Sequence, residues 1–136
     1  MTTIPITIRN LGPEETHILE NVRPGVCDSF DLTRAWSLLA TRINEFVVAL
    51  EQGEVIGFVY GSMLMHPDKP SEFLVSGFHV HDDYATAEVG ARLLDRLRNL
   101  AIDRGCEAMW LVDQDAKAIV AGNTESISAK LFRWEI

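Results

Sequence analysis

The stretch that decides the fold is Ser76–Ala101, SGFHVHDDYATAEVGARLLDRLRNLA. Together with the residues just before it, it predicts a strand over Glu72–Val80, because this segment is rich in aromatic, β-branched and bulky apolar residues. A long amphipathic helix follows, whose apolar stripe is formed by Val89, Leu93, Leu94, Leu97, Leu100 and Ala101. Gly105 comes after the last turn, where helices commonly end in a left-handed residue.

The polar loop between this strand and this helix is the first place to look for chemistry. A strand that runs into a helix through a short loop directs the first backbone N–H groups of the helix at one point, which favours an anion. The loop and first turn carry the carboxylates Asp82, Asp83 and Glu88, and Arg92 lies a full turn into the helix. Carboxylates are favourable at the positive end of a helix dipole, but they oppose an anionic ligand there.

The segments that precede this stretch alternate between strand and helix patterns. Apolar residues alternate from Ile4 to Ile8, which predicts a strand that Pro5 assigns to an edge. Pro13 predicts the start of a short helix that ends before Pro24-Gly25, and a second helix is expected from Asp31. Its expected buried stripe is Leu32, Ala35, Trp36 and Leu39.

Further strands are expected on both sides of the central one. Phe46–Leu50 and Val55–Leu64 flank a short Gly-containing turn and predict a hairpin. Met109–Val112 predicts a short buried strand parallel to the central strand. A two-turn helix over Asp115–Ala121 and a last strand over Ser126–Ile136 complete the expected order. That last strand places Phe132, Trp134 and Ile136 on one side, which predicts a homodimer interface through the C-terminal strand.

Composition narrows the class of protein. The chain has 136 residues, 47% of them hydrophobic and 24% charged, which indicates one globular domain over 1–136. A net charge of −8 argues against nonspecific nucleic-acid binding, and no run approaches membrane-spanning length. Cys27 and Cys106 are expected to be reduced thiols of a cytoplasmic protein without a leader peptide.

The strand ending in Val80, the polar loop, and Gly90-Ala91 opening a helix that continues RLLDRL resemble the acetyl-CoA-binding core of the GNAT N-acetyltransferases. The segments VVALEQGEVIGFVYG, HPDKP and RGCEAMWLV are most similar to the gentamicin/fortimicin-type aminoglycoside acetyltransferases. The resemblance implies an α/β GNAT-like fold with a mixed, mostly antiparallel sheet flanked by helices. It also implies acetyl-CoA as a substrate, bound by Phe78, Val80, Ala85, Thr86, Glu88, Val89, Gly90 and Ala91.

The chain departs from that family at several positions that carry chemistry. The family's loop has Arg or Gln, Gly, and Gly or Ala where this chain has Ala85, Glu88 and Gly90, so only the last one matches. The place of the glutamate base holds Gly77, and the expected two-turn helix contains no tyrosine. His79 and His81 at the strand end are the candidate proton acceptors, because histidine titrates near neutral pH. No set of residues has the spacing of a strong metal site, so no metal is expected.

Two functions therefore stay open. The first is an acyl-CoA-dependent N-acetyltransferase acting on a small amine. The second is a catalytically degenerate protein of the same fold that acts as a binding or dimerising module without turnover of acetyl-CoA. The retained strand–loop–helix favours the first function, and the altered loop favours the second.

Overall fold

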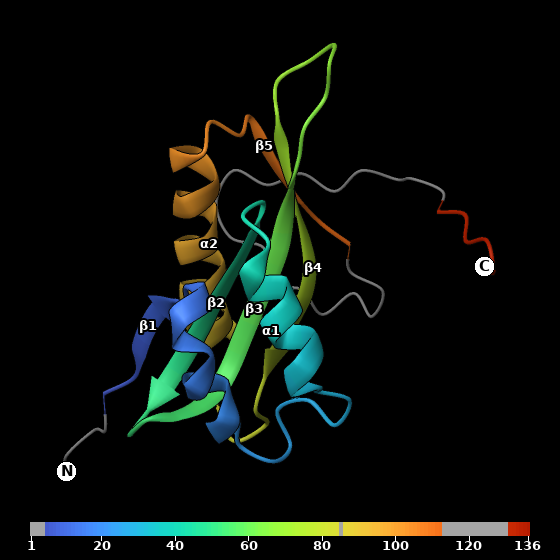
Figure 1. Ribbon diagram of the computed structural model, residues 1–136. Helices are drawn as coiled ribbons and strands as arrows, with labels where there is room; N and C mark the ends of the chain where they lie inside the picture. Colours follow the sequence, from blue (N-terminus) through green and yellow to red (C-terminus); the bar gives the residue numbers. More distant parts are fainter. Residues whose placement is uncertain (1–4, 85, 113–130) are drawn as a thin grey trace.

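One mixed sheet organises the computed structural model, which describes residues 5–84, 86–112 and 131–136. Its strands in these ranges are β1 (Thr7–Asn10), β2 (Asn44–Glu51), β3 (Glu54–Leu64), β4 (Glu72–Val80) and β5 (Ala108–Leu111). They lie side by side in chain order, antiparallel from β1 to β4, while β4 and β5 are parallel. The expected mixed, mostly antiparallel sheet is confirmed, and its parallel step lies where the sequence predicts it (Figure 1).

Helices cover both faces of the sheet. The 3₁₀ helix η1 (Pro13–Asn21) and the helix α1 (Leu32–Ala40) lie on one face, and α2 (Ala91–Asp103) lies on the other (Figure 1). A π-helical turn, η2 (Thr86–Gly90), leads into α2. The start of α1 was expected at Asp31, whose carboxylate accepts a hydrogen bond from the Arg34 N–H at 2.9 Å and so caps the helix. No helix in the described ranges is long and apolar enough to cross a membrane.

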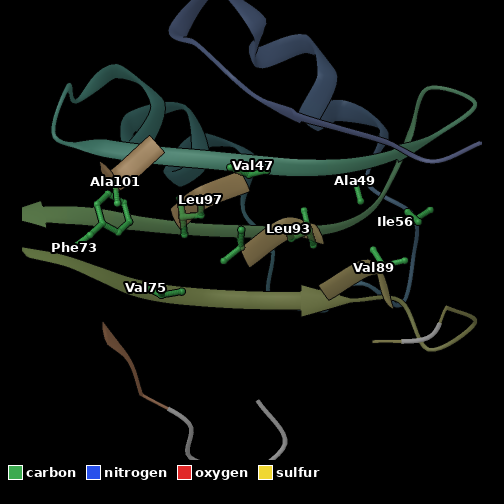
Figure 2. Close-up of a cluster of buried hydrophobic side chains, with 10 residues drawn as sticks. Val47, Ala49, Ile56, Phe73, Val75, Val89, Leu93, Leu97 and Ala101 are labelled. Atoms are coloured by element: carbon green, nitrogen blue, oxygen red, sulfur yellow. The ribbon is translucent and has the colours of Figure 1, made fainter. Parts of the chain in front are cut away.

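The face under α2 holds the larger part of the core. The predicted apolar stripe of the helix is confirmed, because Leu93, Leu97 and Ala101 are buried against Phe73 and Val75 of β4 (Figure 2). Each fully buried leucine contributes about 1.5–3 kcal/mol relative to an exposed one. Packing against the sheet therefore fixes α2, and with it the loop that α2 continues.

The opposite face is covered by α1 and η1, and here one expectation is wrong. Ala35 and Leu39 are buried as predicted, but Trp36 is 42% exposed and is not part of the core. Leu38, which is partly buried, completes the inward side of the helix. Trp36 follows Ala35 by about 100° around the helix axis, so a helix centred on Ala35 and Leu39 turns it to the flank.

Two turns have the left-handed backbone conformation that the sequence indicates at their glycines. Gln52 and Gly53 have φ of 51° and 79°, the left-handed pair that a two-residue hairpin turn requires. Gly105 has φ of 82° just after α2, which confirms it as the left-handed residue beyond the helix end.

A β-bulge in β4 decides which side chains meet the site. Tyr60 pairs with Gly77 and the next residue, Gly61, pairs with Val75, so Ser76 is an extra residue in β4. The alternation of β4 side chains between the two faces of the sheet therefore shifts by one residue at Ser76. Val75 and Phe78 both pack against the cluster under α2, although they are three residues apart.

The described ladder between β4 and β5 ends next to the bulge. Their ladder runs from Glu72–Ala108 to Val75–Leu111 and ends there, so the rest of β4 has no ladder partner on the β5 side within the described residues. This arrangement confirms the expected parallel pair, connected through α2.

The C-terminal expectations have different outcomes. The predicted helix Asp115–Ala121 and the first part of the predicted last strand lie outside the described residues. Residues 131–136 are not in a strand, which corrects the expected strand at its end. Phe132 and Trp134 are 74% and 78% exposed, and their ring centroids are 6.4 Å apart. The apolar row exists, but no strand of the described sheet lies beside it to pair with it (Figure 1).

Candidate active site

A pocket of about 270 Å³ opens between α1 and the sheet, at the part of β4 that follows the bulge. Two parts of the chain form it: the loop before α1 together with α1 itself, and the sheet face beneath them. Its walls are Cys27, Ser29, Phe30, Asp31, Arg34, Ala35, Leu38, Phe46, Phe58, Tyr60 and His79.

The floor of the pocket is aromatic. Phe58 stacks on Phe46 with ring centroids 5.3 Å apart, and the Tyr60 ring lies 5.8 Å from that of Phe46. The strand register places Phe58 beside His79 and Tyr60 beside Gly77. The floor is therefore set by the pairing of β2, β3 and β4.

His79 contributes an imidazole to this floor. Its ring centroid is 5.1 Å from that of Phe58, and burial lowers the pKa of its imidazole below the ordinary value of 6.5. The imidazole is therefore neutral at pH 7 and able to accept a proton. Its Nε2 atom lies 4.0 Å from the Cys27 Sγ atom across the pocket.

The mouth of the pocket carries one charge of each sign. Asp31 and Arg34 are both exposed and both line the pocket, at the N-terminal end of α1. The carboxylate of Asp31 is already held by the cap hydrogen bond to the Arg34 N–H, which fixes its position at the rim. A ligand amine would meet this carboxylate on entering.

His81, the second candidate, lies outside the pocket. Its ring packs against Gly25, where an added Cβ would be 3.1 Å from His81 Nε2, and Gly25 has φ of 96°. Its Nδ1 atom accepts the Asp83 N–H at 3.1 Å and is also 3.7 Å from the Asp83 carboxylate. The contact to the amide is the shorter of the two and holds the ring. His81 thus shapes the loop after β4.

The same loop is tied to the β2–β3 hairpin through Tyr84. The Tyr84 hydroxyl accepts a hydrogen bond from Arg23 and donates one to Glu51 Oε1 at 2.7 Å. Arg23 also pairs with Glu54 at 2.6 Å. The loop is thereby anchored on its inner side, while Asp82 and Asp83 are exposed.

The residues that the resemblance assigned to acetyl-CoA fall into three groups. Phe78 and Val80 pack against the core under α2, and Val89 is buried in that core. Thr86, Glu88, Gly90 and Ala91 form the π-helical turn and the first residue of α2, with Glu88 exposed and Gly90 buried. Ala85 lies outside the described residues.

Cations near this turn are engaged elsewhere. Arg92 donates to the Ile6 carbonyl at 3.0 Å, and Arg96 donates to Asn10 Oδ1 at 2.8 Å. Both guanidinium groups therefore bind the β1 region rather than the start of the helix. The described carboxylates at that start are Asp82, Asp83 and Glu88.

The comparisons with known proteins identify the family. The acetyltransferase (GNAT) family model matches residues 15–121, so the chain belongs to this family. No curated protein sequence matches the chain.

Solved structures with the same fold span nearly the whole chain. An aminoglycoside acetyltransferase from an uncultured soil metagenomic sample has a TM-score of 0.75 at 16% identity, covering 96% of this chain and 99% of its own. The ribosomal-protein-alanine N-acetyltransferase of Brucella melitensis biovar Abortus 2308 has a TM-score of 0.65 at 20% identity, covering 93% and 99%. AAC(6')-Iy bound to the bisubstrate analogue CoA-S-monomethyl-acetylneamine has a TM-score of 0.69 at 16% identity, covering 95% and 99%. At these identities the likeness shows the fold.

The backbone of this chain fits acetyl-CoA, whereas the charges at the start of the helix do not. The strand–loop–helix is present, and among the described residues the part of β4 after Val75 has no ladder partner on the β5 side. The exposed acids at the helix start oppose the pyrophosphate. The described residues contain no group of three or more His, Cys, Asp or Glu side chains that could hold a metal ion.

The structure adds residues that the sequence did not single out for the site. Cys27, Asp31, Arg34 and Tyr60 line the pocket beside His79. Tyr60 had a signal, because alternation in β3 places it on the same face as Phe58. The others had none, since their place depends on where the loop before α1 crosses the sheet.

Proposed function

We propose that this protein is an acyl-CoA-dependent N-acetyltransferase that acts on a small amine bound in the pocket beneath α1. The observation that carries the proposal is the position of His79. A neutral imidazole lines the pocket on the part of β4 that follows the last β4–β5 pair. The family's acyl donor would enter between these two strands and the amine through the pocket, so the imidazole would lie between the two substrates.

The chemistry asked of this chain is proton transfer. An amine is protonated at neutral pH and attacks a thioester only after it loses a proton, which His79 would accept. Over the whole reaction the amine nitrogen gains a bond to the acyl carbon, and the bond from that carbon to the CoA sulfur is broken. Tyr60 lines the same pocket, and its hydroxyl would be the donor for the departing thiolate.

Features of the pocket support a small amine with an apolar body. Phe46, Phe58 and Tyr60 present aromatic faces, which attract a cation as well as apolar groups. The Asp31 carboxylate at the rim favours the ammonium form on entry. Aminoglycosides are the substrates named for some neighbours in fold, and a volume of about 270 Å³ suits one ring of such a molecule or a simple arylalkylamine.

The second function, a binding module without turnover, is supported by one observation. Asp82, Asp83 and Glu88 are exposed around the start of η2, where the family binds pyrophosphate. If these charges prevent acetyl-CoA from binding, the pocket would still take an amine, and no product would form.

A transfer assay separates the two functions. The purified protein is incubated with acetyl-CoA and, in separate reactions, an aminoglycoside, a polyamine and an arylalkylamine, and acetylated amine is measured by mass spectrometry. We expect product with at least one amine, and a fall of about 10²–10⁴-fold in rate for His79→Ala. His17→Ala is the matched control, because His17 is exposed on η1 and outside the pocket. Absence of product with every amine, together with amine binding by calorimetry, would establish the binding module instead.

Two further properties belong to this proposal. We place the protein in the cytoplasm, because Cys27 and Cys106 are both free thiols, as in reducing compartments. We also propose a homodimer that covers the exposed Phe132 and Trp134.

A further inference from the structure

A thiol and an imidazole face one another inside the pocket. The Cys27 Sγ atom lies 4.0 Å from His79 Nε2 and 3.6 Å from Ser29 Oγ, and all three residues line the cavity. Cys27 belongs to the loop between η1 and α1, whereas His79 belongs to β4, so the fold brings the two together.

Packing holds both partners in place. The loop turns through hydrogen bonds from the Val26 N–H to the Arg23 carbonyl and from the Phe30 N–H to the Cys27 carbonyl, each 3.2 Å long. The side chain of Val26 is buried in the core beneath, which fixes the loop on the sheet. On the other side, the His79 ring rests against Phe58. The packing of the loop and of the His79 ring therefore holds the sulfur and the imidazole next to one another.

We propose that Cys27 is a nucleophile that accepts the acyl group before the amine does, with His79 as its base. This inference rests on the proposed function for the identity of the acyl donor. The thiol proton moves to His79 Nε2, and the sulfur forms a bond to the acyl carbon. The bond from that carbon to the leaving group then breaks, and the leaving group takes up the proton. The amine attacks the acyl-Cys27 thioester, its proton passes through His79, and the Cys27 thiol is restored.

The electrostatic setting is consistent with this role. The thiolate is the reactive form of cysteine, so a nucleophilic cysteine needs a nearby proton acceptor. Burial lowers the pKa of His79, so the imidazole is unprotonated and available at neutral pH. No charge has to be created beforehand for the first proton transfer to begin.

The second cysteine provides a matched control. Cys106 follows α2 and packs against the core cluster on the opposite face of the sheet. Burial raises the pKa of its thiol, which makes the thiolate scarcer. The chain thus contains one thiol paired with an imidazole in a pocket and one thiol outside that pocket.

The test uses two acyl donors and intact-mass measurement with peptide mapping. The full chain is treated with p-nitrophenyl acetate, which needs no CoA site, and separately with acetyl-CoA. We expect one acetyl group on Cys27 with p-nitrophenyl acetate, none on Cys27→Ser or Cys27→Ala, and unchanged labelling of Cys106→Ser. His79→Gln should slow the labelling by about 10²-fold, the usual effect of losing a positioned base. Circular dichroism of each variant checks that it is folded.

The outcomes separate this inference from the proposed function. Labelling by p-nitrophenyl acetate, with neither labelling nor amine acetylation by acetyl-CoA, would support the nucleophile and contradict the transferase. Amine acetylation at an undiminished rate in folded Cys27→Ser would support the transferase and overturn the nucleophile, since transfer would then be direct. Equal labelling of Cys27 and Cys106, or labelling that His79→Gln does not slow, would also overturn it.

Discussion

The aromatic ring of Tyr60 occupies the space that a side chain at Gly77 would need. A Cβ atom at Gly77 would lie 2.6 Å from the Tyr60 hydroxyl oxygen and nearer still to its ring carbons. The family's glutamate base belongs at this position by resemblance. In this chain the phenol ring fills that space, and the neighbouring His79 is the proton acceptor that we propose in the pocket.

This contact predicts that Gly77 cannot be enlarged. Gly77→Ala should destabilise the fold by about 1–3 kcal/mol, because the added methyl forces the Tyr60 ring out of its stack with Phe46. Urea unfolding followed by circular dichroism measures the loss.

A double-mutant cycle tests the cause. If Tyr60 is the obstacle, Gly77→Ala should cost less in a Tyr60→Ala background than in the unmodified chain. Gly53→Ala is an informative comparison, since nothing lies within 4 Å of its Cβ position and any cost there comes from its φ of 79° alone. Equal costs of Gly77→Ala with and without Tyr60 would contradict the explanation.

The sequence predicted the scaffold well for a physical reason. The bounds of β4 and the apolar stripe of α2 follow from local patterns, and both were confirmed. Trp36 shows the limit of such patterns. It is apolar and lies at helical spacing from Leu32 and Leu39, yet its side chain is exposed on the flank of the helix. The spacing of apolar residues predicts which side of a helix is buried, but the rotation of the helix about its axis on the sheet is set by tertiary packing.

The site was less predictable, because it depends on a register shift. Strict alternation from Val75 would place His79 on the α2 side, beside Phe73. The extra residue Ser76 moves it to the α1 side, where the pocket lies. The contact of Cys27 with His79 spans 52 residues, and no local pattern encodes it.

His79 predicts a dependence of stability on pH. The folded protein holds the pKa of His79 below 6.5, so between the two values the unfolded chain binds a proton that the folded chain does not. The free energy of unfolding should therefore decrease as pH falls from 6.5 through the lowered pKa. His79→Gln should flatten this decrease, and His17→Gln, at an exposed position, should not. Urea unfolding from pH 7.5 to 5 measures it, and parallel curves for the unmodified chain and His79→Gln would refute the assignment.

Tyr84 predicts a link between the loop and the hairpin. Tyr84→Phe removes the hydroxyl that joins Arg23 to Glu51, and should lower the free energy of unfolding by about 1 kcal/mol. In a Glu51→Gln background the same change should cost less, because the charged acceptor is already gone. A cost that is unaffected by Glu51→Gln would show that the hydroxyl acts through some other contact.

The C-terminal row predicts assembly. Phe132 and Trp134 are exposed side by side, and an apolar patch of this kind is usually covered by a partner, most often in a symmetric dimer. Light scattering at micromolar concentration should give the mass of a dimer, and the double variant Phe132→Ser, Trp134→Ser should give a monomer. Trp36→Ser, which removes an exposed tryptophan on α1, should leave the dimer intact. A monomeric unmodified protein would count against this interface.

The acids at the start of α2 predict weak binding of acetyl-CoA. Glu88 is exposed in the turn where the pyrophosphate of the family's substrate is bound, and Arg92 is engaged with the Ile6 carbonyl instead of that turn. Like charges a few ångströms apart repel strongly even near a protein surface, and after screening by salt one such contact still lowers affinity by about tenfold. Glu88→Gln should therefore strengthen binding by about tenfold in calorimetry. Asp103→Asn, which removes an exposed acid at the far end of the same helix, should leave the affinity unchanged.

Added salt should narrow the difference in affinity between Glu88→Gln and the unmodified chain, because screening already removes part of the repulsion. Micromolar affinity in the unmodified protein, unchanged by Glu88→Gln, would show that the carboxylate turns away from the bound pyrophosphate.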